Sequence, residues 1–466
     1  MNSVIKKKQF FNSNYFKFAM VSLIIVLLLI PMGMMESLVV DRKIKHDSVA
    51  EEISNLWGGS QTLVGPFLEV PYEYEYMQYL PSKSKNVIKR VKGSVIFLPD
   101  DLSIDGNLKP DYRKRGIYKI VVYQGKFKIA GTFDKLDVSN LNLSDKRLKN
   151  NHLKWNSASL KFYLSDIKGV TNNPKINWNL KSFAVKPAGI YSSSRNVSYQ
   201  GFMVGLSVDS TKLNDFSFAL DMKGSPDINF VPFGKSTRIT LQSGWPSPKF
   251  TGSYLPDKHS ITEKGFKASW YISQLNRPLP QAWLKSNTPG FSPFKFGARL
   301  IEPVNKYLQS LRAVKYSILF ILLSFITLFF VELFTKNETN ILQYLLTGLA
   351  LVLFFSILLS LSEQMSFGLA YLISTASIIG LISAYNFNLT KKLKSTLVLF
   401  FLWSVLYGFL YFILRLEDLA LLAGNIGLFV ILAAIMFASK KLSVKNTNEI
   451  KGSGTGDLIV DRGDSL

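Results

Sequence analysis

The chain has 466 residues and carries 55 Lys and Arg against 32 Asp and Glu, a net charge of +23, yet its mean hydropathy is positive at +0.16. It has three histidines and no cysteine, which excludes disulfides, thiolate metal sites and cysteine nucleophiles. A soluble nucleic-acid-binding protein would not combine this charge with 47% hydrophobic residues, so the apolar and the charged residues must be segregated along the chain.

Six apolar runs that are almost free of charge predict six membrane spans. Each has about 18–21 residues, the length of helix that crosses a hydrocarbon core of about 30 Å. The first run follows three lysines and lacks a small-residue cleavage site, so we interpret it as an anchor and not as a cleaved signal peptide. The runs cover residues 18–35, 316–334, 341–361, 367–385, 395–414 and 419–438.

The basic residues beside these runs predict the orientation of the chain. Lysines are concentrated in the N-terminal tail, around residues 391–394 and around 440–445, and basic flanks stay in the cytoplasm. Six spans then place both termini inside. The predicted order is a cytoplasmic tail (1–17), an anchor (18–35), an outside domain (36–315), a five-helix bundle (316–438) and a cytoplasmic tail (439–466). The outside domain holds 41 Lys and Arg against 23 Asp and Glu, and so +18 of the +23.

An amphipathic helix is predicted at the start of the outside domain. Val40, Ile44, Val49, Ile53 and Trp57 recur at spacings of four or five among charged residues and end before two glycines. We interpret the stripe as a packing face that continues the first span. A membrane-surface helix is the alternative.

After this helix the hydrophobic period changes to two, which indicates β-strands. Alternation occurs around residues 68–76, 127–133, 160–164, 216–222 and 239–241, and Pro71 limits the first of these to an edge strand or two pieces. We therefore expect a mainly antiparallel β domain, sandwich-like or a curled sheet, beside a membrane α-helical bundle. Turns are predicted at Pro99-Asp100-Asp101, Asp105-Gly106, Gln124-Gly125 and Gly224-Ser225-Pro226.

No motif in the sequence predicts catalytic, cofactor-binding or metal-binding residues. Glu332 and Glu363 lie near the ends of predicted spans, where we interpret them as interfacial side chains. Two basic clusters in the outside domain are candidate contacts for anionic envelope molecules, although lysines spread over solvated loops are the alternative. The clusters are Lys83, Lys85, Lys89, Arg90 and Lys92, and Lys109, Arg113, Lys114 and Arg115.

Distinctive strings occur in both halves of the chain, at residues 57–66, 241–250, 252, 255–256, 265–270, 296–303, 312–316, 342–346 and 361–363. Together they resemble the CreD family, inner-membrane proteins of Gram-negative bacteria. They occur in family order, and one departure is Gln364, where the family is expected to have histidine. A further candidate motif for binding or structure lies within them: Trp245, Pro246, Pro248, Gly252, Pro256, Gly265, Phe266 and Trp270.

The resemblance implies a six-span inner-membrane protein with a large periplasmic domain, associated with cell-envelope integrity and linked to a two-component regulatory system. It implies no catalytic residues and no cofactor. We expect a non-enzymatic protein whose partners are membrane lipids and anionic envelope polymers or periplasmic proteins, with no nucleic acid. A transporter or lipid-handling membrane protein is the alternative, and an enzyme acting on lipid or cell wall is third.

Overall fold

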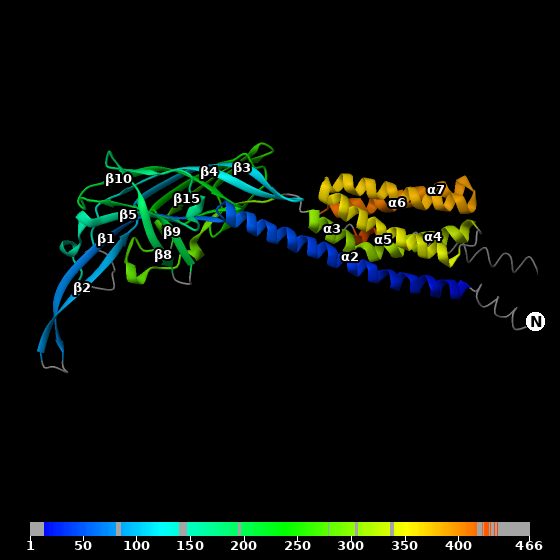
Figure 1. Cartoon of the computed structure of the whole chain (residues 1–466), viewed down its shortest axis with the longest axis horizontal. Coiled ribbons are helices and arrows are strands. Elements are labelled where there is room, and N and C mark those ends of the chain that lie inside the picture. Colours follow the sequence, from blue (N-terminus) through cyan, green and yellow to red (C-terminus); the bar gives the residue numbers. More distant parts are fainter. Residues whose placement is uncertain are drawn as a thin grey trace, which may run out of the picture. The chain divides into compact units, whose positions relative to one another are not determined.

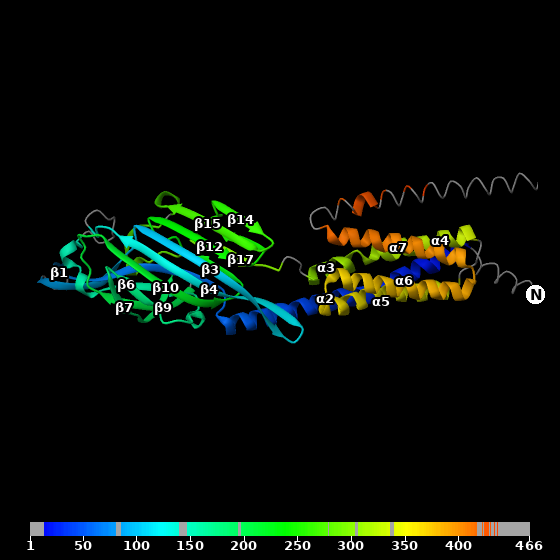
Figure 2. The same cartoon turned by 90° about the horizontal axis from the view of Figure 1, so that it is seen from above.

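The computed structural model describes residues 14–80, 85–138, 147–193, 197–277, 279–302, 306–335 and 340–416, with isolated helical positions between 422 and 436. It divides into two compact units, one made of residues 1–43 and 305–466 and the other of residues 44–304. The first unit is helical and the second is built from β-strands (Figures 1 and 2).

The helical unit contains helices that are long and apolar enough to cross a membrane. The described residues hold four such helices, or five if the pair Tyr307–Lys315 and Ser317–Phe329, bent by 46°, counts as one span. The sixth predicted span, 419–438, lies mostly outside the described residues. The helices are α2 (Asn14–Trp57), α3 (Lys306–Lys315), α4 (Ser317–Thr335), α5 (Ile341–Gln364), α6 (Phe367–Thr390) and α7 (Leu393–Arg415).

The helical unit has its own apolar core. Leu28 of α2 lies against Gly348 of α5, where a Cβ would stand 2.3 Å from the leucine side chain and would require it to shift. Phe320, Phe354 and Tyr407 form an aromatic cluster whose ring centroids are 4.5 to 6.4 Å apart. The apolar residues of these helices thus pack against one another as well as facing outward.

Two sheets make up the β-rich unit. In the described residues a nine-stranded sheet has the order β13-β17-β11-β1-β5-β9-β8, with β2 and β16 joined beside β1, and an eight-stranded sheet has the order β14-β15-β12-β3-β4-β10-β6-β7. Figure 2 shows the second sheet from its outer side. The strands are β1 (Gln61–Leu80), β2 (Lys85–Phe97), β3 (Asp101–Arg115), β4 (Tyr118–Phe133), β5 (Ala158–Leu164), β6 (Lys175–Trp178), β7 (Lys181–Ala184), β8 (Lys186–Ser193), β9 (Val197–Leu206), β10 (Asn214–Gly224), β11 (Asp227–Phe230), β12 (Ser236–Ser243), β13 (Pro248–Gly252), β14 (Lys258–Thr262), β15 (Gly265–Ser273), β16 (Ala282–Leu284) and β17 (Phe296–Leu300).

The two sheets pack face to face over a shared aromatic core. Phe162 of β5 contacts Phe218 of β10 with ring centroids 5.3 Å apart, and Phe127 of β4 contacts Phe230 of β11 at 6.3 Å. Along β10 buried positions alternate with more accessible ones, as expected when one face of a sheet is covered. Most strand pairs are antiparallel, but β1 pairs with β11 and β3 pairs with β12 in parallel.

Pro71 does not interrupt β1. Pairing between β1 and β5 ends at Glu69, and the Pro71 carbonyl accepts a hydrogen bond from the Lys154 N–H on that same side. On that side no strand among the described residues pairs with Pro71. The N–H that proline lacks would therefore have had no strand partner, and its absence costs no ladder hydrogen bond. The sequence allowed either an edge strand or two separate pieces. From Pro71 onward β1 is an edge strand on the side that faced β5.

Two of the predicted turns are wrong. Asp105-Gly106 lies inside β3 and Gln124-Gly125 inside β4, where each residue is paired across the sheet. These glycines serve the core, because a Cβ on Gly106 would stand 2.7 Å from the Phe127 ring and one on Gly125 would stand 2.5 Å from it. The turn signals at 99–101 and 224–226 do separate strands.

Candidate functional site

The C-terminal end of α2 is held in the β-rich unit by cations and hydrogen bonds. The Trp57 ring has the Arg113 guanidinium 4.1 Å and the Lys223 ammonium 4.5 Å from its centroid, and its Nε1 donates to the Tyr123 carbonyl at 3.3 Å. In such cation–π contacts the aromatic ring itself attracts the cation, so Arg113 and Lys223 are stabilised here without a carboxylate. Arg113, a candidate anion contact in the sequence, is thus directed at an aromatic ring.

An ion pair between a buried carboxylate and a half-exposed guanidinium lies next to this anchor. The guanidinium of Arg299 binds both carboxylate oxygens of Asp227, at 2.6 and 2.9 Å, and the Ser60 hydroxyl donates to the same carboxylate at 3.2 Å. Hydrogen bonding to the carboxylate raises the pKa of Arg299 further. The strings 57–66 and 296–303, far apart in sequence, meet here to fix the end of the helix to β11 and β17.

The tryptophan motif occupies a corner between the sheets. Trp245 and Trp270 are buried, and their Nε1 atoms donate to the carbonyls of Ile301 at 2.8 Å and Tyr254 at 3.2 Å. Gly252 and Gly265 have φ of +95° and +137°, and a Cβ on either would overlap a neighbouring backbone carbonyl. The buried Phe266 ring contacts Phe250, while Pro246, Pro248 and Pro256 lie at or between the short strands. The side chains of Trp245, Phe266 and Trp270 thus pack inside the protein.

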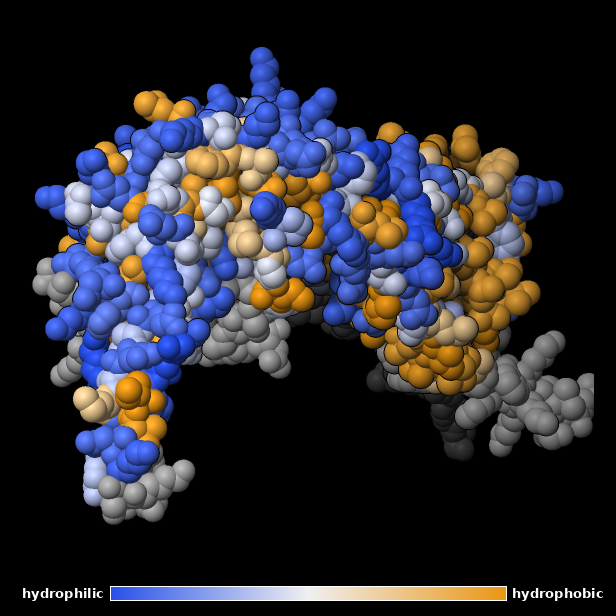
Figure 3. Space-filling view, turned by 60° about the vertical axis from the view of Figure 1, so that its left-hand side comes forward, coloured by the Kyte–Doolittle hydropathy of each residue, from blue (hydrophilic) through white to orange (hydrophobic). Residues whose placement is uncertain are grey.

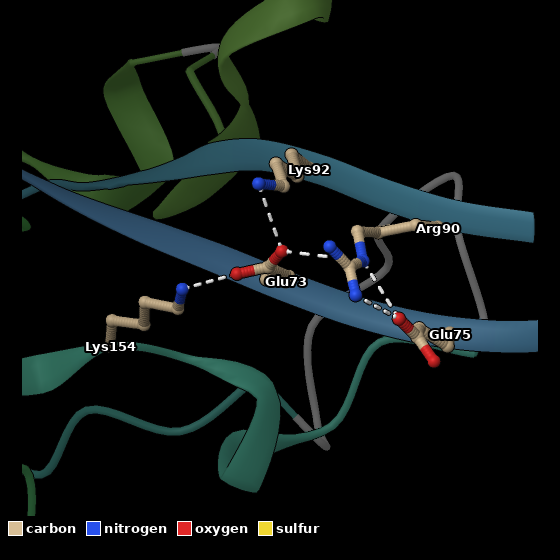
Figure 4. Close-up of polar contacts among 5 residues, drawn as sticks. All are labelled: Glu73, Glu75, Arg90, Lys92 and Lys154. Carbon is tan, nitrogen blue, oxygen red and sulfur yellow. Dashed lines mark hydrogen bonds and ion pairs between the residues drawn. The ribbon is translucent and has the colours of Figure 1, made fainter.

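The first basic cluster is partly neutralised at the base of the β1–β2 hairpin (Figure 4). Glu73 binds Lys92 at 3.0 Å, Arg90 at 3.7 Å and also Lys154, and Arg90 binds Glu75 at 2.7 Å. Hydrogen bonds from Lys154 and then Lys92 lower the pKa of Glu73 to about 2. Arg90 and Lys92 are therefore engaged within the hairpin.

The remaining candidate cations differ in their contacts. Arg115 pairs with Glu52, and Arg113 also has Asp111 at 3.7 Å. In the described structure no ion pair is found for the exposed Lys85, Lys89 and Lys114, and Lys83 lies outside the described residues. The two basic clusters of the sequence are thus reduced to a few uncompensated lysines.

A polar groove on the outer face of the eight-stranded sheet was missed by the sequence reasoning. It has a cavity volume of about 520 Å³ and contains three lysines with carboxylates, amides and a hydroxyl. Across the strands, Asn107 lies opposite both Lys126 and Gln242, and Asp105 lies opposite both Lys128 and Thr240. The lining residues are Asp105, Gly106, Asn107, Lys126, Phe127, Lys128, Ala219, Asp221, Thr240, Gln242 and Lys267.

The groove lysines are uncompensated although carboxylates are near. In the structure as described, no ion pair joins Lys126, Lys128 or Lys267 to Asp105 or Asp221. Alternating polar residues on β3, β4 and β12 were the only signal in the sequence. Lys126 and Lys128 lie on β4 and Lys267 lies on β15, more than a hundred residues later in the chain, so only the sheet order brings these lysines together.

Two acidic residues of the helical unit, Glu332 and Glu363, have cationic partners. Lys17 Nζ lies 3.1 Å from Glu332 Oε1, and the Tyr344 hydroxyl donates to Glu332 Oε2 at 2.8 Å. Arg42 lies 3.5 Å from Glu363. Within the part of the chain that the structure describes, no group of three or more His, Asp or Glu could hold a metal ion.

Comparison with known proteins gives matches over almost the whole chain. Residues 13–445 match the family model for the inner membrane protein CreD. The chain is 31% identical over 428 residues to the inner membrane protein CreD of Escherichia coli (strain K12), covering 90% of this chain and 91% of that protein. A crystal structure of a candidate nutrient-binding protein from Legionella pneumophila is similar at 10% identity and a TM-score of 0.24, over 40% of this chain and 68% of that one.

Proposed function

The chain belongs to the CreD family of inner membrane proteins, and we propose that it supports cell-envelope integrity without catalysing a reaction. In this proposal residues 44–304 form a periplasmic unit that binds an anionic component of the envelope. The helical unit anchors that binding unit in the membrane or relays its state.

The observation that carries the proposal is the outer groove of the eight-stranded sheet. Lys126, Lys128 and Lys267 offer three ammonium groups that have no ion-pair partner among the described residues, and Asn107, Gln242 and Thr240 offer neutral hydrogen-bonding groups between them. Ammonium groups bind phosphate and carboxylate as point charges, while amides and hydroxyls bind sugar hydroxyls. This combination suits a phosphorylated or carboxylated glycan or lipid headgroup.

The orientation in the proposal rests on charge. The basic flanks favour cytoplasmic N- and C-termini, which places residues 44–304 outside. A reporter fused after residue 466 should be active only in the cytoplasm, and one inserted at the exposed β14–β15 turn only in the periplasm. A periplasmic C-terminus would contradict the six-span topology.

The groove is tested with a triple variant, Lys126→Gln, Lys128→Gln and Lys267→Gln. We expect it to lose protection against envelope stress in a strain lacking the native gene, at unchanged protein level. The matched control removes three exposed lysines elsewhere on the same sheet, Lys175→Gln, Lys181→Gln and Lys258→Gln. Equal protection by the groove variant and the control would contradict the proposal.

A transporter or lipid-handling protein is the second candidate. The ion pair between Lys17 and Glu332 favours this second candidate, and Tyr344 also donates a hydrogen bond to Glu332. Charged side chains among apolar helices cost free energy, so they are usually kept for a function such as transport. The two candidates differ in what α3 to α7 must do. A chain shortened to residues 1–304 should retain protection if the periplasmic unit acts by binding, and should lose it completely if the helical unit transports.

A further inference from the structure

The β1–β2 hairpin leaves the body of the sandwich as a two-stranded ribbon. The strands pair continuously from Leu68 opposite Phe97 to Leu80 opposite Lys85. Other neighbours end early, because β5 pairs with β1 only up to Glu69 and β16 pairs with β2 only at 95–97. Figure 1 shows the ribbon projecting beyond the remaining strands of its unit.

The two faces of this ribbon differ. On one face the Tyr74 ring stacks on His152 with centroids 5.1 Å apart, and the Arg147 guanidinium lies 4.0 Å above the Tyr76 ring. The segment before β5 covers the proximal part of this face, at Tyr74 and Tyr76. On the other face Glu73 and Glu75 pair with cations near the base, and alternation then places Met77 and Tyr79 further out on the same face.

The distal part of the second face is apolar and solvent-exposed. Met77 lies opposite Ile88 in the pairing register, and the exposed fractions are 76% for Met77, 67% for Ile88 and 59% for Tyr79. Figure 3 shows an apolar patch on the projecting hairpin, bordered by hydrophilic surface. Apolar side chains at this level of exposure, gathered at the end of an arm, mark an interaction surface.

Charge on the distal hairpin is of one sign. Lys85 and Lys89 are exposed on β2, on the face opposite Ile88, and the sequence has no Asp or Glu between Glu75 and Asp100. Lysines along an exposed ribbon edge oppose the addition of another strand. A cationic ribbon with one apolar face instead has the composition of an interfacial membrane segment, in which lysines reach headgroups while apolar side chains enter the acyl boundary.

We propose that the distal β1–β2 hairpin inserts Met77, Tyr79 and Ile88 into the surface of an anionic lipid bilayer, and that this bilayer faces the one that holds the spans. Lys85 and Lys89 bind its headgroups. The lipid contact goes beyond the role proposed for the groove and involves other residues.

The choice of a facing bilayer follows from where the chain enters and leaves the β-rich unit. The Ser54 hydroxyl of α2 donates to the Ser225 carbonyl at 2.8 Å, and the Leu300 N–H donates to the Pro226 carbonyl at 3.2 Å, so both connections to the helical unit meet at one place. β1 starts beside this place, because the Ser225 N–H donates to Gly59. Its 20 residues then extend about 65 Å along the strand, at about 3.3 Å per residue, before the hairpin turns.

The absence of cysteine allows a single-site test on the full chain. Ile88→Cys carries an environment-sensitive NBD dye, and Ser260→Cys on the exposed β14 is the matched control. Each labelled protein is held in nanodiscs of phosphatidylcholine and mixed with vesicles of phosphatidylcholine alone or with phosphatidylglycerol. We expect a blue-shifted, stronger emission at position 88 with phosphatidylglycerol vesicles only, and no change at position 260.

Two variants separate the charge from the apolar contact. Lys85→Gln with Lys89→Gln should weaken vesicle partitioning about 30-fold, because one basic residue near an anionic surface contributes about fivefold. Met77→Ser with Tyr79→Ser should remove the blue shift, while tryptophan fluorescence confirms that the variant is folded.

Three results would overturn the inference. If the emission at position 88 does not change with either kind of vesicle, the apolar patch does not bind lipid and a protein partner becomes the alternative. If the emission at position 260 changes equally, the vesicles adsorb non-specifically. A change produced by phosphatidylglycerol in the nanodisc alone, without vesicles, would show insertion into the chain's own bilayer and refute the facing one. None of these three results involves the groove lysines, so they test the hairpin independently of the proposed function.

Discussion

The two halves of β1 have opposite environments. From Gln61 to Val70 every residue is buried, because β5 pairs on one side of the strand and β11, followed by β2, pairs on the other. From Pro71 to Leu80 the strand pairs with β2. Tyr72 and Tyr74 remain buried on the covered face, but the apolar Met77 further out is exposed, while the acidic Glu69 in the first half is buried. Whether a residue of β1 is buried therefore depends on which strands and segments lie beside it, and Met77 and Glu69 show that its own hydrophobicity does not decide this.

Removing an aromatic ring from the buried half should have the largest effect. Phe67 is fully buried and its ring lies 5.8 Å from Tyr163 and 6.0 Å from Phe233. We expect Phe67→Ala to lower the free energy of unfolding of the β-rich unit by about 3–5 kcal/mol, through lost burial and a cavity. Tryptophan fluorescence during denaturant unfolding measures this, since six of the seven tryptophans lie in residues 44–304.

Met77→Ala is the matched change in the exposed half. It should alter the free energy of unfolding by no more than about 0.5 kcal/mol, as is usual for exposed positions. Similar losses for both variants would mean that the distal hairpin is covered in the folded protein and would contradict the comparison.

Charge pairs should show the same contrast with a smaller effect. The Glu69 side chain is only 9% exposed, and it binds Lys161 at 2.7 Å and Lys285 at 2.9 Å. Glu69→Gln leaves both lysines without their carboxylate, so we expect a loss of about 1–3 kcal/mol. Glu75→Gln, whose partner Arg90 is 61% exposed, should leave the unfolding midpoint unchanged. A midpoint unaffected by Glu69→Gln would show that the buried pairs do not stabilise this half of β1.

Much of this architecture follows from local sequence signals. The apolar runs predict membrane helices, and period-two alternation predicts β-strands such as β5 and β10, because both periods are properties of single elements. Asp105-Gly106 and Gln124-Gly125 were wrong as turn predictions because each glycine leaves space for the Phe127 ring. This need for space arises from packing in the folded sheet, and a local turn pattern does not reveal it.

The sites required information that no local window contains. The groove combines lysines of β4 and β15, and the pairing register that makes them neighbours comes from parallel contacts between β3 and β12. The lysine cluster at residues 83–92 was visible in the sequence, but its division into paired Arg90 and Lys92 and exposed Lys85 and Lys89 depends on where Glu73 and Glu75 lie across the hairpin.

Acid should weaken the buried half of β1 in a defined pH window. Burial alone would raise the pKa of Glu69, but hydrogen bonds from Lys161 and Lys285 outweigh it and lower the pKa below its ordinary value of 4.5. A carboxyl whose pKa is lower when folded stabilises the protein above about pH 4.5, and this stabilisation is lost as the pH falls through the folded pKa. The denaturant midpoint of the unaltered protein should therefore fall more steeply below pH 4.5 than that of Glu69→Gln. Parallel curves would exclude Glu69 as the source.

A smaller pH effect than that of Glu69 is expected from Glu73, which lies just after Pro71. Its pKa is also lowered, to about 2, through hydrogen bonds from Lys154 and Lys92, so its contribution has the same sign and is lost between about pH 4.5 and pH 2. Because the partner lysines are more than half exposed, added salt should screen this contribution, while that of Glu69 should persist. Comparing Glu73→Gln with Glu69→Gln at low and high salt tests the point. A salt-resistant effect at Glu73 would mean that the protected part of β1 extends past Pro71 and that the boundary between the two halves lies further along the hairpin.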